Sequence, residues 1–101
     1  MKRIMLACSA GMSTSLLVTK MEAVAKERGL ELKIWAISEA KIADYIKDCD
    51  VVLLGPQVRF MLSKAQGIAA PYNIPVEVIN MKHYGMCDGK AVLDRALELV
   101  K

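Results

Sequence analysis

A cysteine followed by small and hydroxyl-bearing residues is the feature of this sequence with the clearest chemical potential. Residues 8–15 read CSAGMSTS, with Cys8 first and four hydroxyl residues among the seven that follow. A thiol attacks as the thiolate, which a helix N-terminus or converging backbone N–H groups stabilise. The same N–H groups bind tetrahedral anions such as phosphate. The stretch therefore predicts a cysteine nucleophile that carries a phosphoryl group.

Each residue type in this stretch has a place in such a phosphate-binding loop. Gly11 permits backbone angles that let successive N–H groups converge on an anion. Ser13 or Thr14 can cap the following helix, and their hydroxyls can donate to phosphate oxygens. The structural alternative is a buried cysteine that closes a strand and precedes an ordinary turn and helix cap. The candidate phosphate-binding residues are Ser9, Ala10, Gly11, Met12, Ser13, Thr14 and Ser15.

Short apolar runs alternate with helical patterns along the chain, and these elements must position the loop. Residue 29 is a glycine at the place of a helix C-cap. The first long apolar alternation resembles a strand exposed on one face, whereas the run VVLL is typical of a strand buried on both faces. The expected strands are 3–7, 30–37, 51–54 and 75–79, and the expected helices are 14–28, 39–47, 58–70 and 89–100.

Strands that alternate with helices predict right-handed crossovers and a parallel sheet with helices on both faces. We expect a four-stranded, flavodoxin-like α/β sheet in the order 2-1-3-4, forming one domain over residues 1–101. Such sheets bind ligands at the carboxyl ends of their strands. The segments expected at that edge are 8–13, 36–39, 55–60 and 80–88.

Composition narrows the classes of function. The 101 residues are 54% hydrophobic and 25% charged, with a net charge of +3 and no Lys/Arg run, so nucleic acid is not an expected partner. No apolar stretch has the length of a membrane span, and the segment after the charged start is too short for a signal peptide, which favours a cytoplasmic protein. Three widely spaced cysteines and one histidine suggest neither a disulfide framework nor a zinc site, and no metal or cofactor is expected.

The whole chain resembles the stand-alone enzyme IIB of the bacterial phosphoenolpyruvate-dependent sugar phosphotransferase system, lactose/cellobiose (chitobiose) type. The resemblance lies in CSAGMSTSLLV at 8–18, DVVLLGPQV at 50–58, PVEVI at 75–79 and YGMCDG at 84–89. It implies that a phosphohistidine of the IIA protein phosphorylates Cys8, which passes the group to a sugar held by the membrane-bound IIC transporter. A carrier that docks on two partners in turn is expected to be a monomer.

Low-molecular-weight tyrosine phosphatases, and the arsenate reductases built on their fold, are the main alternative because they share the sheet and a cysteine-led loop. Their loop is C-x5-R, whose arginine grips the phosphate and stabilises charge in the transition state. Here the fifth residue after Cys8 is Thr14, and Asp88 has no neighbours that match the phosphatase acidic loop. A loop without arginine suits a carrier. A non-catalytic binding domain on the same sheet is a third reading, and it would tolerate Cys8→Ser.

Other polar residues near the expected carboxyl edge receive supporting or structural roles. Gln57 follows a Gly-Pro turn and Tyr84 follows the fourth strand, and both are candidate neighbours of the phosphate loop. Asp88 is expected to cap the last helix. His83 has no base or orienting group beside it and is expected on a surface loop.

The remaining sulfur residues divide between the two ends of the sheet. Cys49 stands at a strand entrance, the wrong end for chemistry, whereas Cys87 would serve a reductase relay only if it approached Cys8. Several methionines fall at or near the expected carboxyl edge, and flexible side chains of this kind suit a surface that fits more than one partner. They are Met12, Met61, Met81 and Met86.

Overall fold

The computed structural model describes residues 2–9 and 12–100, with residues 12 and 13 described by their backbone alone. The elements in chain order, with η marking a 3-10 helix, are β1 Lys2–Cys8, α1 Met12–Glu27, β2 Leu32–Ser38, η1 Glu39–Lys41, α2 Ile42–Tyr45, η2 Ile46–Asp48, β3 Val51–Leu54, η3 Pro56–Met61, α3 Leu62–Ala69, η4 Ala70–Tyr72, β4 Val76–Val78, α4 Met81–Gly85 and α5 Gly89–Leu99.

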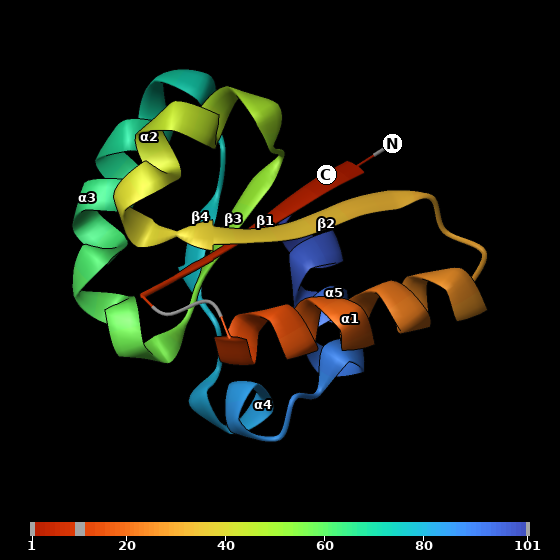
Figure 1. Cartoon of the computed structure of the whole chain (residues 1–101). Coiled ribbons are helices and arrows are strands. Elements are labelled where there is room, and N and C mark those ends of the chain that lie inside the picture. The colour runs from red at the N-terminus through yellow and green to blue at the C-terminus, as the bar shows by residue number, and fades with distance from the viewer. Residues whose placement is uncertain (1, 10–11, 101) are drawn as a thin grey trace.

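The four strands form one parallel sheet in the order β2-β1-β3-β4, which confirms the predicted topology (Figure 1). The central strand β1 pairs on both sides, with Met5 opposite Trp35 of β2 and Val52 of β3. Because all strands run the same way, their carboxyl ends meet at one edge. That edge receives the segments that follow Cys8, Ser38, Leu54 and Val78.

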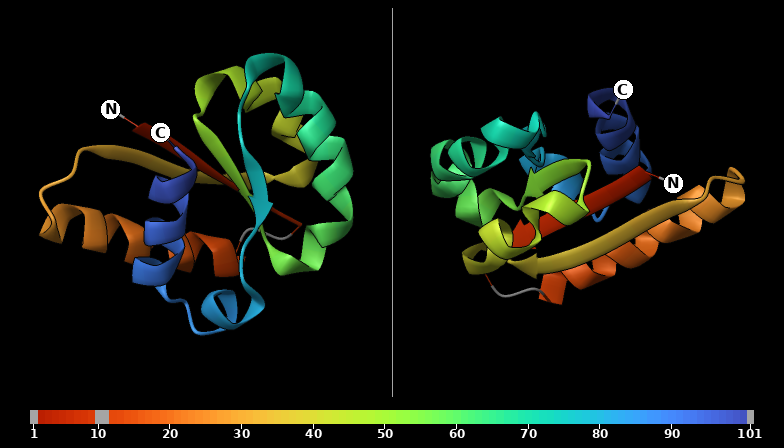
Figure 2. Two further views of the ribbon diagram at one scale, coloured as in Figure 1. Left: turned by 180° about the vertical axis from the view of Figure 1, so that it is seen from behind. Right: turned by 90° about the horizontal axis from the view of Figure 1, so that it is seen from above.

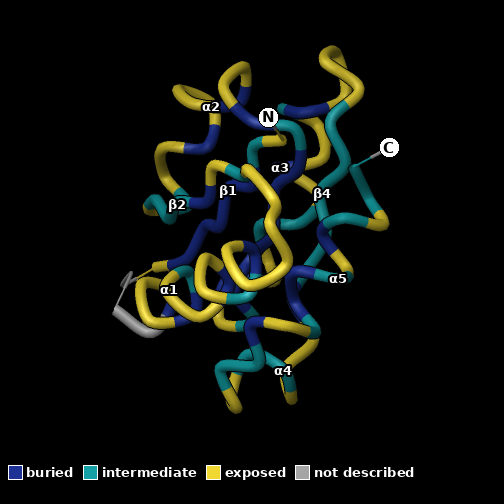
Figure 3. The backbone as a smooth tube through the Cα atoms, turned by 90° about the vertical axis from the view of Figure 1, so that its right-hand side faces the viewer, coloured by how far each residue is buried: buried dark blue, intermediate teal, exposed yellow. Residues whose placement is uncertain are grey.

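Helices cover both faces of the sheet, so the alternating side chains of β1 and β3 enter two separate cores. Helices α1 and α5 pack on one face, where Ile4, Leu6 and Leu53 are buried. Helices α2 and α3 cover the other, where Met5 and Leu54 are buried (Figures 1 and 2). Figure 3 shows the burial concentrated along the central strands. The prediction that 51–54 is buried on both faces is confirmed, since every residue of β3 is buried.

Helix α1 ends as its sequence predicts. Gly29 has a φ of +71°, a left-handed conformation that glycine adopts without a Cβ clash. The N–H of Leu30 then donates to the carbonyl oxygen of Ala25 at 2.9 Å, which satisfies one of the last carbonyls of the helix. The chain is thereby turned into β2.

The prediction that the second strand is exposed on one face is wrong. Ile34 is buried against α1 and α5, but Trp35 and Ile37 on the other side also pack against the core under α2 and α3. Lys33 remains exposed, and its Nζ lies 4.9 Å from the centre of the Trp35 ring. A parallel sheet layered with helices on both sides shields both faces even of an edge strand.

The helical segments after β2, β3 and β4 are more broken than the periodicity indicates. The expected helix 39–47 is divided into η1, α2 and η2, although Ile42 and Ile46 are buried as their spacing predicts. The next helix begins at Pro56, before the expected start, and Val58 within it has non-helical backbone angles. Segment 80–88, expected to be a loop, contains the short helix α4.

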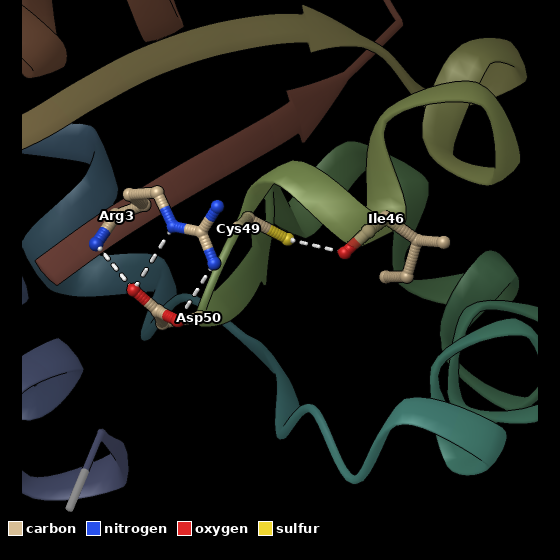
Figure 4. Close-up of polar contacts among 4 residues, drawn as sticks. All are labelled: Arg3, Ile46, Cys49 and Asp50. Carbon is tan, nitrogen blue, oxygen red and sulfur yellow. Dashed lines mark hydrogen bonds and ion pairs between the residues drawn. The ribbon is translucent and has the colours of Figure 1, made fainter.

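The amino end of the sheet is joined by an ion pair. The side-chain carboxylate of Asp50 accepts from the backbone N–H of Arg3 at 2.8 Å and from its guanidinium at 3.1 Å (Figure 4). The Asp50 N–H donates in return to the Arg3 carbonyl oxygen at 2.8 Å. These bonds tie the beginning of β1 to the beginning of β3. The guanidinium of Arg3 lowers the pKa of Asp50 below its ordinary value.

Candidate phosphate-binding site

Cys8 is the last residue of β1 and lies at the carboxyl edge of the sheet. It pairs with Ser38 of β2, and its side chain is fully buried. On its other side, the N–H of Gly55 donates to the carbonyl oxygen of Ala7 at 2.8 Å and holds the end of β3 against β1. Strand pairing therefore holds Cys8 on the β2 side and its neighbour Ala7 on the β3 side.

Helix α1 begins only four residues after Cys8, so its first turn lies close to the cysteine in the chain. The first N–H groups of a helix have no partner within the helix, and α1 has no acidic residue in its first turn to occupy them. Ser9 is exposed, whereas Ala10 and Gly11 lie outside the described residues, as do the side chains of Met12 and Ser13. A helix N-terminus thus follows the thiol after a short connection in the chain.

The prediction that Ser13 or Thr14 caps α1 is wrong, because the helix already begins at Met12. Both residues belong to the first turn of the helix. Thr14 is instead the one fully buried polar residue in the part of the chain that the structure describes. Its Oγ1 lies 3.1 Å from the hydroxyl oxygen of Tyr84, and either group can be the donor.

Tyr84 joins Thr14 to a third residue, Gln57. The Nε2 of Gln57 donates to the Tyr84 hydroxyl oxygen at 3.0 Å. We call these three residues the Thr14–Gln57–Tyr84 cluster. They come from α1, η3 and α4, which follow three different strands at one edge of the sheet (Figures 1 and 2). The structure thus brings both candidate neighbours of the loop, Gln57 and Tyr84, to a residue of the loop itself.

Gly55 connects this cluster to Cys8. A Cβ built at Gly55 would lie 2.7 Å from Oε1 of Gln57 and 3.3 Å from Cβ of Cys8. The Gln57 side chain therefore folds back over Gly55, beside the cysteine, into space that any larger residue would fill. The Gly-Pro pair predicts only a turn at Gly55, although a glycine directly after a buried strand is also the signal of a close approach.

Helix α4 orients Tyr84 and is itself held by Asn80. The side-chain oxygen of Asn80 accepts from the backbone N–H of Lys82 at 2.9 Å and of His83 at 3.2 Å. The Asn80 carbonyl oxygen also accepts from the N–H of Tyr84 at 2.9 Å. This cap was not predicted, although asparagine before a polar turn is a common helix start.

The other predicted roles at this edge are partly confirmed. Asp88 caps α5, since its carboxylate accepts from the N–H of Ala91 at 3.0 Å. The expectation that His83 lies on a surface loop is wrong, because it is a half-buried residue of α4. Its side chain lines a hollow of about 410 Å³ between β4 and α5, together with Glu77 and Arg95. That hollow is not lined by Cys8 or by the cluster.

The two other cysteines differ from Cys8 in their surroundings. Cys49 is buried at the amino end of β3, where its thiol donates to the carbonyl oxygen of Ile46 at 3.4 Å (Figure 4). Burial there raises the pKa of the Cys49 thiol to about 11. Cys87 lies half-buried in the turn between α4 and α5, with a φ of +50°. None of the described cysteines is in a disulfide.

The described residues contain neither a cluster of metal-binding side chains nor a membrane-spanning helix. Among residues 2–9 and 12–100, no group of three or more His, Cys, Asp and Glu side chains could hold a metal ion. Within the same ranges, no helix combines the length and the apolar character needed to cross a membrane.

Comparison with known proteins gives one consistent family. The family model "PTS system, Lactose/Cellobiose specific IIB subunit" matches residues 3–95. The chain is 52% identical over 100 residues to the PTS system oligo-beta-mannoside-specific EIIB component of Bacillus subtilis, which spans 99% of this chain and 97% of the relative. It is also 27% identical over 81 residues to the PTS system lactose-specific EIICB component of Lacticaseibacillus casei, covering 80% of this chain and 14% of that larger protein.

Two solved structures share the fold over nearly the full chain. The cellobiose-specific phosphotransferase IIB component of Borrelia burgdorferi is 40% identical, with a TM-score of 0.82 over 98% of this chain and 91% of that one. The lactose-specific IIB component domain of Streptococcus pneumoniae has a TM-score of 0.89 over 99% and 98% of the two chains. At 16% identity, this second likeness shows the fold alone.

Proposed function

This chain belongs to the lactose/cellobiose-specific IIB family of the sugar phosphotransferase system and is a phosphotransferase, and we propose that Cys8 carries the phosphoryl group. The observation that carries the proposal is the position of Cys8, buried at the carboxyl end of β1 and followed within four residues by the N-terminus of α1. In this proposal the chain acts as a single, monomeric IIB domain in the cytoplasm. It requires no metal or cofactor, because backbone N–H groups can balance the charge of a bound phosphoryl group.

The reaction has two displacement steps. The Cys8 thiolate attacks the phosphorus of a phosphohistidine on the IIA protein, an S–P bond forms, and the N–P bond breaks. With a proton on its other ring nitrogen, the histidine leaves as neutral imidazole. A hydroxyl oxygen of the sugar held by IIC then attacks the same phosphorus, the S–P bond breaks, and the thiolate is regenerated. The hydroxyl proton leaves to a base of the acceptor or to solvent.

The backbone amides of residues 9–15 are proposed to bind the phosphoryl oxygens on Cys8. Fixed N–H dipoles at a helix N-terminus stabilise negative charge without reorganising during the transfer. Because these N–H groups stabilise the thiolate and the bound phosphoryl group alike, they suit a carrier that must both accept and release the phosphoryl group.

The Thr14–Gln57–Tyr84 cluster is proposed to supply a side-chain donor as well. The two hydroxyls of Thr14 and Tyr84 have two hydrogens between them, and only one is used in the bond that joins them. The Gln57 amide already donates to Tyr84 with a hydrogen of its own. One O–H hydrogen therefore remains for a phosphoryl oxygen, whichever of the two hydroxyls acts as donor in the pair.

The phosphatase alternative requires a guanidinium at the position of Thr14. In this chain that residue is buried and bonded to Tyr84, so the loop has no cation of its own to stabilise the charge of a hydrolytic transition state. A transfer protein benefits from that absence, because water is then a poor competitor for the phosphoryl group.

The sugar is proposed to be chosen by the IIC partner. Proteins similar to this chain have names that refer to oligo-beta-mannoside, cellobiose and lactose. A IIB component works with a IIC transporter, and in the Lacticaseibacillus casei relative the EIICB name joins the two in one chain.

Reconstitution tests the proposal. The protein is mixed with phosphoenolpyruvate, the general phosphotransferase proteins and IIA, and its intact mass is measured. We expect one phosphate adduct on the wild type and none on Cys8→Ser. An unmodified wild type, with phosphorylated IIA demonstrated in the same tube, would refute the proposal. Release of phosphate from p-nitrophenyl phosphate by the protein alone would instead support the phosphatase alternative.

A further inference from the structure

The hollow between β4 and α5, which we call the β4–α5 hollow, has no part in the proposed transfer step. Its volume of about 410 Å³ lies within the usual range of ligand pockets, about 300–1,000 Å³. The lining combines charged side chains with an apolar floor, which is formed by the buried residues Leu53, Ile79 and Val92. A cavity of this size and composition accommodates one long side chain that is apolar along its stem and charged at its end.

The packing of α5 leaves this part of the sheet open. A Cβ built at Gly89, the first residue of α5, would lie only 2.6 Å from the backbone carbon of Lys20 in α1. Asp94 of α5 also pairs with Arg28, which directly follows α1, at 2.6 Å. These contacts hold α5 against α1, whereas β4 forms the edge of the sheet beyond β3 (Figure 2). The β4–α5 hollow is therefore a consequence of the fold.

Two carboxylates and one guanidinium give the β4–α5 hollow its charge. The Nε of Arg95 donates to both carboxylate oxygens of Glu77 at 3.0 Å, and its Nη1 donates to Oε2 of Glu98 at 3.0 Å. The Oε1 of Glu98 has no such bond within the described residues, and this side chain is 65% exposed. With His83 neutral, the lining has a formal charge of −1, opposite in sign to the net charge of +3 of the whole chain.

His83 adds hydrogen-bonding groups to the β4–α5 hollow. Its residue is half-buried, and its ring has no hydrogen-bond partner in the part of the chain that the structure describes. A neutral imidazole has one donor and one acceptor nitrogen, so it can bond to a peptide group that enters the hollow. The next residue of α4 is Tyr84, whose hydroxyl bonds to Thr14. An occupant of the hollow therefore contacts the helix that carries part of the candidate site.

We infer that the β4–α5 hollow receives a lysine or arginine side chain from a cytoplasmic loop of the IIC transporter. The aliphatic stem of this side chain lies on Leu53 and Ile79, and its charged end pairs with Glu98 and Glu77. The inference rests on the proposed function, in which Cys8 delivers the phosphoryl group to a sugar held by IIC. The contact adds a second point of attachment, on residues that take no part in the chemistry.

Charge complementarity selects the transporter as the occupant. Loops on the cytoplasmic side of membrane proteins are enriched in Lys and Arg, and a IIB component works with such a membrane protein. A lining with more carboxylates than cations attracts these loops. The same lining repels an acidic surface, which makes an acidic partner the less favourable occupant.

Binding to membranes that contain IIC tests the inference. Inside-out vesicles with the IIC transporter that accepts the phosphoryl group are sedimented with the protein at low and high salt, without sugar. Vesicles that lack IIC give the background. The variant Glu77→Gln/Glu98→Gln reverses the formal charge of the lining. The control Glu22→Gln/Glu27→Gln removes two carboxylates from exposed positions of α1.

A second variant tests the space rather than the charge. Ala91 is half-buried and lines the β4–α5 hollow, so Ala91→Leu fills part of it and leaves every charge in place. The matched control is Ala23→Leu, at an exposed position of α1. Thermal unfolding shows whether each variant is folded, and Ala91→Leu keeps the inference testable if the loss of the Glu77–Arg95 pair prevents folding of the charge variant.

We expect the Kd for IIC vesicles to be at least about tenfold weaker for the charge variant at low salt, with a smaller difference at high salt. Ala91→Leu should weaken binding by a similar factor at both salt concentrations, because it acts by exclusion of the side chain. Both controls should bind like the wild type. Wild-type affinity in the two hollow variants, an equal loss in the controls, or no wild-type binding above background would overturn the inference.

Two further measurements identify other causes and other occupants. Phosphorylation by IIA should be the same in all five proteins, and a wild type without a phosphate adduct would indicate failure of the proposed function itself. Slower phosphorylation of the charge variant by IIA, with unchanged binding to IIC, would overturn the inference in favour of the donor. A wild-type dimer in sedimentation velocity that the hollow variants do not form would overturn it in favour of a second copy of the chain.

Discussion

Replacement of Gly55 by alanine should damage phosphoryl transfer while leaving the fold almost as stable as before. The built Cβ lies 2.7 Å from Oε1 of Gln57, a contact too short to persist. The obstacle is the end of an exposed, flexible side chain, so Gln57 can swing away. In doing so it loses its hydrogen bond to Tyr84 and leaves the space beside Cys8.

The stability change follows from two opposing effects. Gly55 has a φ of −63° and a ψ of 147°, which alanine adopts without strain, so restricting the unfolded chain stabilises the variant by about 0.4–1 kcal/mol. Loss of the Gln57 hydrogen bond costs about 0.5–1.5 kcal/mol. The contact at 3.3 Å with Cβ of Cys8 needs a shift of a few tenths of an ångström at most. The net change in unfolding free energy should therefore be within about 1 kcal/mol.

The transfer rate should change much more. If Gln57 and Tyr84 help to hold the phosphoryl group, loss of a hydrogen bond to a charged group costs about 1.5–3 kcal/mol. That corresponds to a rate of transfer from phosphorylated IIA lower by roughly ten- to 150-fold. Urea unfolding measures the change in unfolding free energy, and quenched-flow phosphorylation of Cys8 measures the transfer rate.

Two other glycines provide matched controls for stability. At Gly89 a built Cβ would lie 2.6 Å from the backbone carbon of Lys20 and 2.8 Å from the backbone nitrogen of Met21, where α5 crosses α1. Backbone cannot swing aside, so Gly89→Ala should destabilise by about 1–3 kcal/mol. Nothing lies within 4 Å of a Cβ at Gly67 in α3, and Gly67→Ala should stabilise by about 0.5–1 kcal/mol.

A double-mutant cycle gives the result that would refute this reasoning. If Gly55→Ala acts only by displacing Gln57, then combining it with Gln57→Ala should slow transfer no further than Gln57→Ala alone. If the double variant instead transfers more slowly than Gln57→Ala by the full effect of Gly55→Ala, the methyl group acts directly on Cys8. An unchanged rate in Gly55→Ala would show that Gln57 has no part in holding the phosphoryl group.

Three more predictions concern the cluster and the two ends of the sheet. Tyr84→Phe leaves the buried Thr14 hydroxyl without its partner and should lower the unfolding free energy by about 1–3 kcal/mol. It should also slow phosphoryl transfer. Urea titration measures the stability and quenched flow the transfer rate, and unchanged stability would contradict the hydrogen bond. Because Arg3 lowers the pKa of Asp50 in the folded state, the stability from this pair is complete above about pH 4 and is lost as the pH falls through the lower folded value. Asp50→Asn should therefore flatten the dependence of thermal midpoint on pH in that acid range, and an unchanged slope would argue against the pair. Burial raises the pKa of the Cys49 thiol to about 11, so a disulfide reagent at pH 8 should leave this thiol unmodified in the folded protein. The thiol should react once urea unfolds the chain, and mass spectrometry maps the modified site. Rapid labelling of Cys49 in the native protein would contradict its burial.

The agreement between sequence and structure is closest where the signal is a short continuous run or a single turn residue. The run VVLL at 51–54 predicted the bounds of β3, because four consecutive apolar residues between turn signals are typical of a strand buried on both faces. Gly29 predicted the end of α1, because a glycine in the left-handed conformation is a local signal for a helix C-terminus. The agreement is weakest at α4 and in the broken helices around α2, where segments of three to five residues depend on tertiary contacts for their stability.

The sequence by itself determined the sheet, its strand order, the position of Cys8 at the carboxyl edge and, through the resemblance of its motifs, the family. Only the tertiary structure decided that Thr14 and Gln57 both bond to the hydroxyl of Tyr84 and that Gly55 makes room for this arrangement. It also decided that Arg59 has no ion pair in the part of the chain that the structure describes. The physical reason is the separation along the sequence between the residues that interact. Periodicity and turn residues report on neighbours along the chain, whereas Thr14 and Tyr84 are 70 residues apart and meet only because parallel strands deliver their following segments to one edge.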